Sequence, residues 1–444
     1  MNVASSASSF LLKEARVAIV GMSMGGVASA LALRPWLDSH EQMAVFERNT
    51  SFAERGQAIG LPMPMLEQLQ TQNWINYDND YHYLTVAKRD WFVRDTQTSN
   101  PKGRLVWTQQ IPMTIHNWGT LHQQLLKNKQ LHKDMLHMGV QVADIDVKDS
   151  GVSLSAMSGE DLGTFDLVIA ADGVNSTLRP MILADENSQP IFAGYVAWRS
   201  SVPLSKLTHI PGLLEEEEEE REESVVNEDS PSNKVTILTA AFNGGQFIGY
   251  IMPGSNPHTD ERSFYWLMFA PTPTDLSFDG GKSVRDVPPL AIQELLQVAD
   301  EHLPPFFGQI IKASVEHDQN LWIHPIVDQV PDKLVHPSNR LLLMGDAAAT
   351  LRPHTASGTV KAFADAMVMG KIASSSPTLI DFAQTYNAER VAEGQTLVKL
   401  GQHLGAAQIL NPPNWTKMSP EDYNNWWLAM ISGTNFAYSN PKSE

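Results

Sequence analysis

No cysteine occurs among the 444 residues of the chain. This absence excludes disulfide bonds, thiolate metal sites and a cysteine nucleophile. Basic residues are scarce as well, because 32 Lys and Arg are outnumbered by 50 Asp and Glu, which leaves a formal net charge of −18. A nucleic-acid-binding protein needs a basic surface, so we expect no nucleic-acid partner.

Long apolar runs are also missing from the sequence. No uninterrupted apolar stretch is long enough to cross a bilayer, so we expect no transmembrane segment. The Ser- and Ala-rich residues 1–16 lack a basic n-region, and we expect a cytoplasmic protein, with a weak targeting segment as the alternative. We assign no set of metal ligands.

The acidic excess is partly local. Residues 215–223 read EEEEEEREE, within a low-complexity segment, 213–233, to which we assign no structure. We interpret this segment as a solvated loop, and a regulatory role is the alternative.

Residues 17–26, VAIVGMSMGG, join an apolar strand to a glycine-rich turn. A strand followed by Gly-x-Gly-x-x-Gly usually marks a dinucleotide site, where a diphosphate lies on backbone N–H groups at a helix N-terminus. Gly21 and Gly26 supply the first and third glycines. Ser23, small and with a hydroxyl donor, replaces the second, and Gly25 adds room. The alternative is an ordinary tight turn of an α/β protein.

A carboxylate closes the second expected strand, MAVFER at residues 43–48. Glu47 stands at about the spacing expected for a side chain that grips a ribose diol. The alternative is a surface glutamate paired with Arg48. Together with the glycine turn, Glu47 indicates a dinucleotide site, without deciding between NAD and FAD.

Two further glycine motifs follow buried strands. DLVIAADGVNSTLRP, residues 166–180, contains Asp172 and Gly173, and GDAAATLRPHTASG, residues 345–358, contains Asp346 and ends at a helix start. In this order and spacing, the three motifs resemble the aromatic-ring hydroxylase class of FAD-dependent monooxygenases.

Within that class the chain is similar to 2,6-dihydroxypyridine hydroxylase-like enzymes. Three segments carry this likeness: HNWGTL at 116–121, GYVAWRSSVP at 194–203, and the RPH triplet at 352–354.

The resemblance implies an α/β fold, with a Rossmann-like (glutathione-reductase-like) FAD-binding domain and a second, mixed β-sheet substrate domain. The expected parts are the first part of the FAD-binding domain at 16–183, the substrate domain at 184–337, the second part of the FAD-binding domain with C-terminal helices at 338–410, and an aromatic tail at 411–444.

The resemblance also implies roles for single residues. The residues expected to bind FAD are Gly21, Ser23, Gly25, Gly26, Glu47, Arg48, Asp172, Gly173, Asp346, Gly358 and Thr359. Asp172 and Gly173 would also help to bind the nicotinamide cofactor. The class commonly has an arginine where this chain has Trp118, which puts one polar flavin contact in doubt.

Catalytic candidates come from two segments. His354, after Pro353, could act above the flavin ring as a hydrogen-bond donor or proton relay, and His116 has a similar claim. The alternative for His354 is a structural role in the turn. Four aromatic residues on expected strands of the second domain are candidates for the substrate pocket: Tyr195, Trp198, Tyr250 and Trp266.

The implied activity is hydroxylation of an electron-rich aromatic or N-heteroaromatic small molecule, with NADH or NADPH as reductant and O2 as co-substrate, through a C4a-hydroperoxyflavin. The alternatives are an FAD-dependent epoxidase of an olefinic or terpenoid substrate, a flavoprotein dehydrogenase that does not activate oxygen, and a non-catalytic flavin-binding module. We expect a monomer or a homodimer.

Overall fold

A computed structural model describes residues 12–52, 57–76, 83–185, 188–213, 234–256, 259, 261–278, 280–317, 321–432 and 434. The acidic run at 215–223 lies outside these described residues. No described helix is both long and apolar enough to span a membrane.

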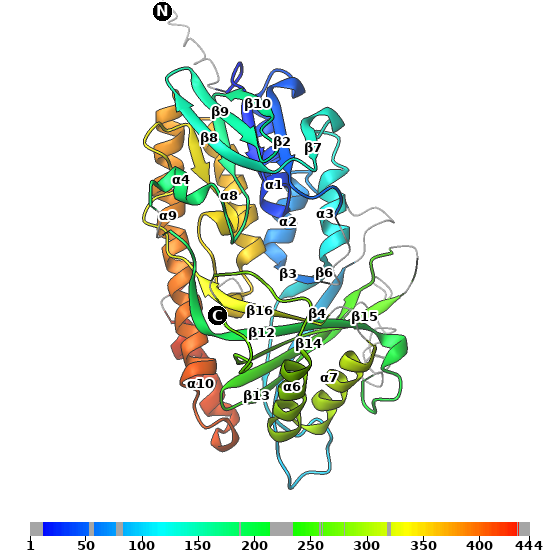
Figure 1. The fold of residues 1–444 in the computed structure, drawn as a ribbon. Coiled ribbons are helices and arrows are strands. Elements are labelled where there is room, and N and C mark those ends of the chain that lie inside the picture. Colours follow the sequence, from blue (N-terminus) through cyan, green and yellow to red (C-terminus); the bar gives the residue numbers. More distant parts are fainter. Residues whose placement is uncertain are drawn as a thin grey trace, which may run out of the picture.

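A parallel five-stranded sheet forms the upper half of the molecule in Figure 1. Its strands, in spatial order, are β17 (Leu341–Leu343), β11 (Leu167–Ala170), β1 (Val17–Val20), β2 (Met43–Glu47) and β7 (Leu136–Met138). β1 and β11 are entirely buried, as expected for short apolar strands covered on both faces. The strand–helix–strand unit expected around the first glycine turn is therefore present.

Helices and a second sheet cover this five-stranded sheet. The helices are α1 (Met24–Leu33), α3 (Trp118–Leu126), α4 (Arg179–Leu183) and α8 (Gly358–Ala373), with α2 (Met63–Thr71) nearby. The antiparallel strands β8 (Val142–Lys148), β9 (Gly151–Ala156) and β10 (Asp161–Phe165) form a three-stranded meander. Apolar side chains from the helices, the sheet and the meander make one buried cluster.

A nine-stranded mixed sheet forms the lower half (Figure 1). Its order is β16 (Trp322–Asp328), β12 (Ile191–Pro203), β15 (Arg262–Pro271), β14 (Gly245–Pro253), β13 (Lys234–Phe242), β4 (Leu84–Val93), β6 (Met113–Asn117) and β3 (Ala58–Pro62), with β5 (Arg104–Gln109) paired to β4. α6 (Pro289–His302) and α7 (Pro305–His317) lie below this sheet in Figure 1.

The two-domain α/β architecture expected from the sequence is confirmed, but the chain divides differently between the two sheets. Strands β3 to β6 lie within 58–117, a segment that the sequence division gave to the FAD-binding domain. They join the nine-stranded sheet instead, because β4 pairs in parallel with β13. Pairing between segments so far apart has no local sequence signal.

The C-terminal helices connect both halves. α9 (Leu379–Gly405) runs down one side of the molecule in Figure 1, continues as a π-helical turn at Ala406–Leu410, and is followed by α10 (Pro420–Ile431). Trp415 and Trp427 of the expected aromatic tail are buried beside Trp107 and Trp91 of the large sheet. The described part of the tail therefore belongs to the core.

Candidate active site

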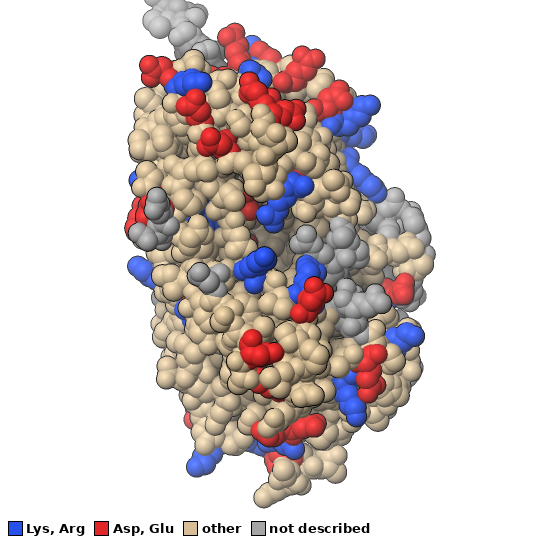
Figure 2. Space-filling model, in the orientation of Figure 1, with Lys and Arg blue, Asp and Glu red and all other residues tan. Residues whose placement is uncertain are grey.

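Two adjoining hollows lie at the carboxyl ends of the parallel strands, where α/β sheets usually bind ligands. One, of about 390 Å³, extends from the start of α1 to the nine-stranded sheet, and the other, of about 260 Å³, lies beside the ends of β1 and β2. Both are lined by Ser23, Trp118, Ala171, Gly173 and Val174. Figure 2 shows Lys and Arg side chains beside a recess near the middle of the molecule, with acidic side chains gathered at the upper end.

The turn after β1 requires glycine at two positions. Gly21 has φ +99°, and a Cβ there would lie 2.3 Å from the carbonyl oxygen of Ala171. A Cβ on Gly26 would lie 1.8 Å from the carbonyl oxygen of Gly21. These approaches bring the N-terminus of α1 tightly against the strand.

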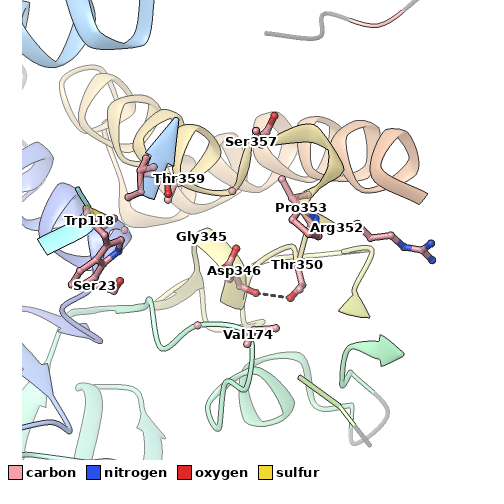
Figure 3. A pocket seen from close by; sticks show the side chains of 18 of the residues that line it. Ser23, Trp118, Val174, Gly345, Asp346, Thr350, Arg352, Pro353, Ser357 and Thr359 are labelled. Carbon is pink, nitrogen blue, oxygen red and sulfur yellow. Dashed lines mark hydrogen bonds between the residues drawn. The ribbon is translucent and has the colours of Figure 1, made fainter. Parts of the chain in front are cut away.

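Ser23 is the N-cap residue of α1, yet its hydroxyl makes no capping hydrogen bond. The side chain is exposed where the two hollows meet, and no acidic residue occupies the first turn of α1. The positive end of the helix dipole is therefore available for an anion. Ser23 and Trp118 lie close together at one end of the view in Figure 3.

Glu47 is buried at the edge of the smaller hollow. Its Oε2 accepts a hydrogen bond from the backbone N–H of Met22 at 3.0 Å, and its Oε1 accepts one from the N–H of Asn49 at 2.9 Å. The carboxylate thus also fixes the glycine turn. Arg48 is exposed and lines the same hollow.

Arg179 ties the second glycine motif to the third. It is fully buried, and its Nε donates to the carbonyl oxygen of Ala347 at 2.8 Å. Its Nη2 donates to the carbonyl oxygens of Val174 and Asp346, each at 3.1 Å. Oδ2 of Asp172 accepts from the backbone N–H of Thr177 at 2.9 Å, while its Oδ1 is buried without a partner among the described residues.

Asp346 projects into the larger hollow (Figure 3). Enclosure by the surrounding protein raises the pKa of its carboxyl, and the nearby charges of Lys361 and Arg179 oppose that shift. The carbonyl oxygen of Asp346 accepts from the Thr350 hydroxyl at 2.9 Å, which holds the turn.

A second helix N-terminus faces the same hollow. α8 begins at Gly358 and Thr359, which both line it, and the N-cap Ser357 makes no side-chain capping bond. No acidic residue lies in the first turn of α8. Two helix dipoles, those of α1 and α8, therefore point their positive ends at one hollow.

A buried ion network, formed by Lys361, Asp365 and Arg390, positions the start of α8. Nζ of Lys361 lies 2.7 Å from Oδ2 of Asp365, and Nε of Arg390 lies 2.6 Å from Oδ1. Oδ2 also accepts from the backbone N–H of Gly345 at 2.9 Å, beside Asp346. Lys361 and Asp365 were not among the residues predicted for the site, although their spacing of four on an expected helix could have indicated a pair.

The RPH turn closes the larger hollow, and Pro353 lines it. His354 lies behind this wall: its Nδ1 is 2.9 Å from Oε1 of Gln408, its Nε2 is 2.7 Å from the Tyr195 hydroxyl, and its ring stacks on Phe269 at 4.2 Å. Burial lowers the pKa of His354 to about 3. The imidazole is therefore neutral at pH 7, with both nitrogens engaged.

Arg352 joins the RPH turn to the large sheet. Its guanidinium points away from Ser23 and Trp118 (Figure 3), and its Nε lies 2.6 Å from Oδ2 of Asp328 on β16. Gln402 of α9 donates to the other oxygen of Asp328 at 2.7 Å. No local sequence pattern relates Asp328, Gln402 and Gln408, so their roles could not be predicted from the sequence.

Three further residues predicted for the site, His116, Trp198 and Trp266, line neither hollow. His116 is fully buried on β6, 2.7 Å from the Thr114 hydroxyl, and lines neither hollow; burial lowers its pKa to about 3. Trp198 and Trp266 were predicted to line the substrate pocket. In the structure both belong instead to the core cluster shared with α6 and α7. The Trp266 indole donates to Ser314 of α7 at 2.8 Å.

Strand alternation explains this outcome. Tyr195 and Arg199 lie on the opposite face of β12 from Trp198, and Arg199 lines the larger hollow. Tyr195 is buried against His354, and Tyr250 on β14 is only partly buried and packs against Tyr265.

No family model matches the chain. The sequence is 24% identical, over 416 residues, to 2,6-dihydroxypyridine 3-monooxygenase of Paenarthrobacter nicotinovorans, covering 89% of this chain and 94% of that relative. The structure of 2,6-dihydroxypyridine-3-hydroxylase from Arthrobacter nicotinovorans superposes with a TM-score of 0.71 at 20% identity, over 97% and 98% of the two chains. HpxO of Klebsiella pneumoniae, complexed with FAD and uric acid, superposes with a TM-score of 0.68 at 20% identity, over 96% and 95%.

The relatives and solved structures that the chain resembles in sequence and fold are FAD-dependent aromatic hydroxylases and monooxygenases. Within this class its relatives include 2,6-dihydroxypyridine 3-monooxygenase, as the sequence motifs predicted.

The site fits FAD on its own geometry. Gly21 and Gly26 leave no space for a Cβ, the Ser23 hydroxyl makes no cap, and one oxygen of Asp172 is buried without a partner among the described residues. Two adjoining hollows also suit a long ligand with an anionic centre, because two uncapped helix N-termini line them.

Proposed function

We propose that the protein is a single-component FAD-dependent monooxygenase that hydroxylates an electron-rich aromatic or N-heteroaromatic small molecule, with NADH or NADPH as reductant and O2 as co-substrate. The observation that carries the proposal is the convergence of the α1 and α8 N-termini on a hollow that reaches the nine-stranded sheet. We also propose that the enzyme is cytoplasmic and that it acts as a monomer or a homodimer.

Successive residues along the two hollows would hold successive parts of FAD. Gly21, Ser23 and the start of α1 would bind the diphosphate, and Glu47, with Arg48 beside it, would bind the adenosine ribose. When bound, FAD supplies the hydride-accepting and oxygen-activating chemistry.

The opposite end would hold the reactive ring. Asp346 would hydrogen-bond the ribityl chain, and the N–H groups of Gly358 and Thr359 would face the N1–C2=O edge of the flavin. A helix N-terminus suits that edge because it stabilises negative charge there.

The RPH turn would shape the reaction space and exclude water from it. Pro353 forms the wall, and His354 fixes that wall through its bonds to Tyr195 and Gln408. Because His354 is neutral at pH 7 with both nitrogens engaged, we assign it a positioning role, in line with the structural alternative, rather than that of a proton relay above the flavin ring.

The test is a screen of the FAD-loaded protein for substrate-stimulated NADH or NADPH oxidation over phenols, hydroxypyridines and indoles. Each product is checked by mass for one added oxygen, and H2O2 is measured separately. We expect stimulated oxidation with an oxygenated product. NADH or NADPH oxidation that yields only H2O2 with every aromatic tested would mean that electrons reach oxygen without oxygenation, and this result would overturn the proposal. The absence of stimulation by any aromatic would overturn it as well.

A further inference from the structure

Arg89 on β4 is a cation on the face of the nine-stranded sheet that is directed toward the larger hollow. Across this face, Trp91, Thr239, Ile248, Leu267 and Arg199 form one row of paired residues. Arg199 lines the larger hollow, so the row leads from that hollow into the sheet. Arg89 precedes Trp91 by two positions on β4 and therefore points to the same face.

The guanidinium of Arg89 has few contacts. Its Nε donates to the Thr239 hydroxyl at 2.8 Å, and its central carbon lies 4.3 Å from the centre of the Trp91 ring. No carboxylate of the described residues lies within ion-pair distance of Arg89. The neighbouring Asp90 points to the other face, where it contacts Lys88 at 3.0 Å and Thr108 at 2.6 Å.

The two Nη atoms of Arg89 make no hydrogen bond with the described residues, yet they are not sealed in the protein. The side chain keeps part of its surface accessible although protein surrounds it. Burial lowers the pKa of Arg89 to about 9, so the group remains a cation at neutral pH. A buried cation without an anionic partner is unfavourable, and its ring contact and single hydrogen bond offset only part of that cost.

Apolar and aromatic side chains share this sheet face with Arg89. Ile248, Leu267 and Tyr250 lie on this sheet face and are only partly buried. The RPH turn lies close to Arg89, because the charge of Arg89 is one of the causes that lower the pKa of His354. A planar aromatic molecule lying between the RPH turn and the sheet would therefore direct one substituent toward the Nη atoms.

We propose that Arg89 binds a carboxylate of the aromatic substrate through its two Nη atoms and so determines specificity for aromatic acids. This inference rests on the proposed monooxygenase function and names its substrate class. A carboxylate is favoured because the planar guanidinium presents two parallel N–H donors that match its two oxygens.

The test is a binding measurement without turnover. The FAD-loaded protein is titrated, in the absence of NADH and NADPH, with three acid and amide pairs: 6-hydroxynicotinate and 6-hydroxynicotinamide, salicylate and salicylamide, benzoate and benzamide. Binding is followed by the flavin absorption spectrum and by calorimetry. For at least one pair, we expect the acid to bind about tenfold or more tightly than its amide, because only the acid forms the charged bidentate pair.

Variants assign this preference to Arg89. Arg89→Gln should bring the ratio of acid to amide affinity to about one while leaving amide binding within about twofold, and Arg89→Lys should retain part of the ratio. The control Lys88→Gln removes one positive charge from the position before Arg89 and should keep the wild-type ratio of acid to amide affinity. FAD content and melting temperature show whether each variant is folded.

Three results would overturn the inference: no acid preferred over its amide by the wild-type protein, a preference that survives Arg89→Gln, or one that Lys88→Gln abolishes equally. If Arg89→Gln does not fold, an unchanged ratio in Arg89→Lys also overturns it. Failure of the proposed function is recognised separately, because it appears as missing oxygenated product and not as a lost affinity ratio.

Discussion

At the scale of single residues, the first glycine turn shows how a departure from a motif is accommodated. Ser23 stands where the fingerprint has a glycine, but its side chain points into the space shared by the two hollows. The positions that cannot carry a side chain are Gly21 and Gly26, where a Cβ would collide with backbone atoms. The steric demand of the turn therefore falls on these two glycines.

Ser23→Gly should retain FAD, whereas Ser23→Leu should weaken FAD binding about 10- to 100-fold, because overpacking costs about 1–3 kcal/mol. The measurement is the FAD bound per chain after dialysis against a series of FAD concentrations. Ser29→Ala, on the buried side of α1, is the control and should bind FAD normally. Normal binding by the leucine variant would mean that the diphosphate does not pass Ser23.

Gly26→Ala and Gly25→Ala form a matched pair on α1. A Cβ at Gly26 meets backbone at 1.8 Å, whereas one at Gly25 meets the flexible tip of Met344 at 2.7 Å. We expect Gly26→Ala to lose about 3–5 kcal/mol of unfolding free energy and Gly25→Ala to change it by less than about 1 kcal/mol. Denaturant titration measures both, and equal losses would contradict the described turn.

At the scale of elements, a network of buried charged side chains fixes the start of α8. Lys361 and Asp365 are at most 2% exposed, and Arg390 reaches them from α9. Since Asp365 also binds the N–H of Gly345, this one carboxylate connects two helices to the turn that carries Asp346.

Asp365→Asn should therefore destabilise the protein by about 3–5 kcal/mol, because two buried cations lose their anionic partner. The matched control is Asp38→Asn, whose exposed pair with Lys13 at 3.8 Å should be worth less than about 1 kcal/mol. Unfolding free energies of both variants are compared with the wild type. A loss below about 1 kcal/mol for Asp365→Asn would show that the network contributes little.

Sequence reasoning reached the elements whose geometry is dictated locally. The turns at Gly21, Asp172 and Asp346 follow short apolar strands, and the residues that force each turn lie within the turn itself. It failed for Trp198 and Trp266, because alternation along a strand defines two faces but does not say which face meets the cavity. The same ambiguity holds for Arg89 on β4, whose face cannot be assigned from the strand pattern alone.

At the scale of the whole molecule, three histidines are held neutral in its interior. Burial lowers the pKa of His116, His324 and His354 to about 3 in each case. In the unfolded chain a histidine has a pKa of about 6.5. Their contribution to stability is therefore complete above about pH 6.5 and is lost as the pH falls toward 3.

Between pH 6.5 and 5, each of these histidines should lower the unfolding free energy with a slope that rises to about 1.4 kcal/mol per pH unit as the pH falls. Denaturant titrations from pH 7.5 to 5 measure the slope. His116→Gln should reduce the part of the slope due to these histidines by about a third. An unchanged slope in His116→Gln would mean that His116 is protonated in the folded protein.

The parallel pairing of β4 with β13 has a consequence for how the chain is made. The paired segments, Leu84–Val93 and Lys234–Phe242, are separated by residues 94–233, which include β7, β11 and the three strands β8 to β10. At a synthesis rate of about 5–20 residues per second, one edge of β4 waits about 7–30 seconds for its neighbour to leave the ribosome. During that interval β4 offers an open edge that carries Trp91 and Phe92, so the nascent chain, rather than the finished enzyme, is where this fold is most exposed to aggregation.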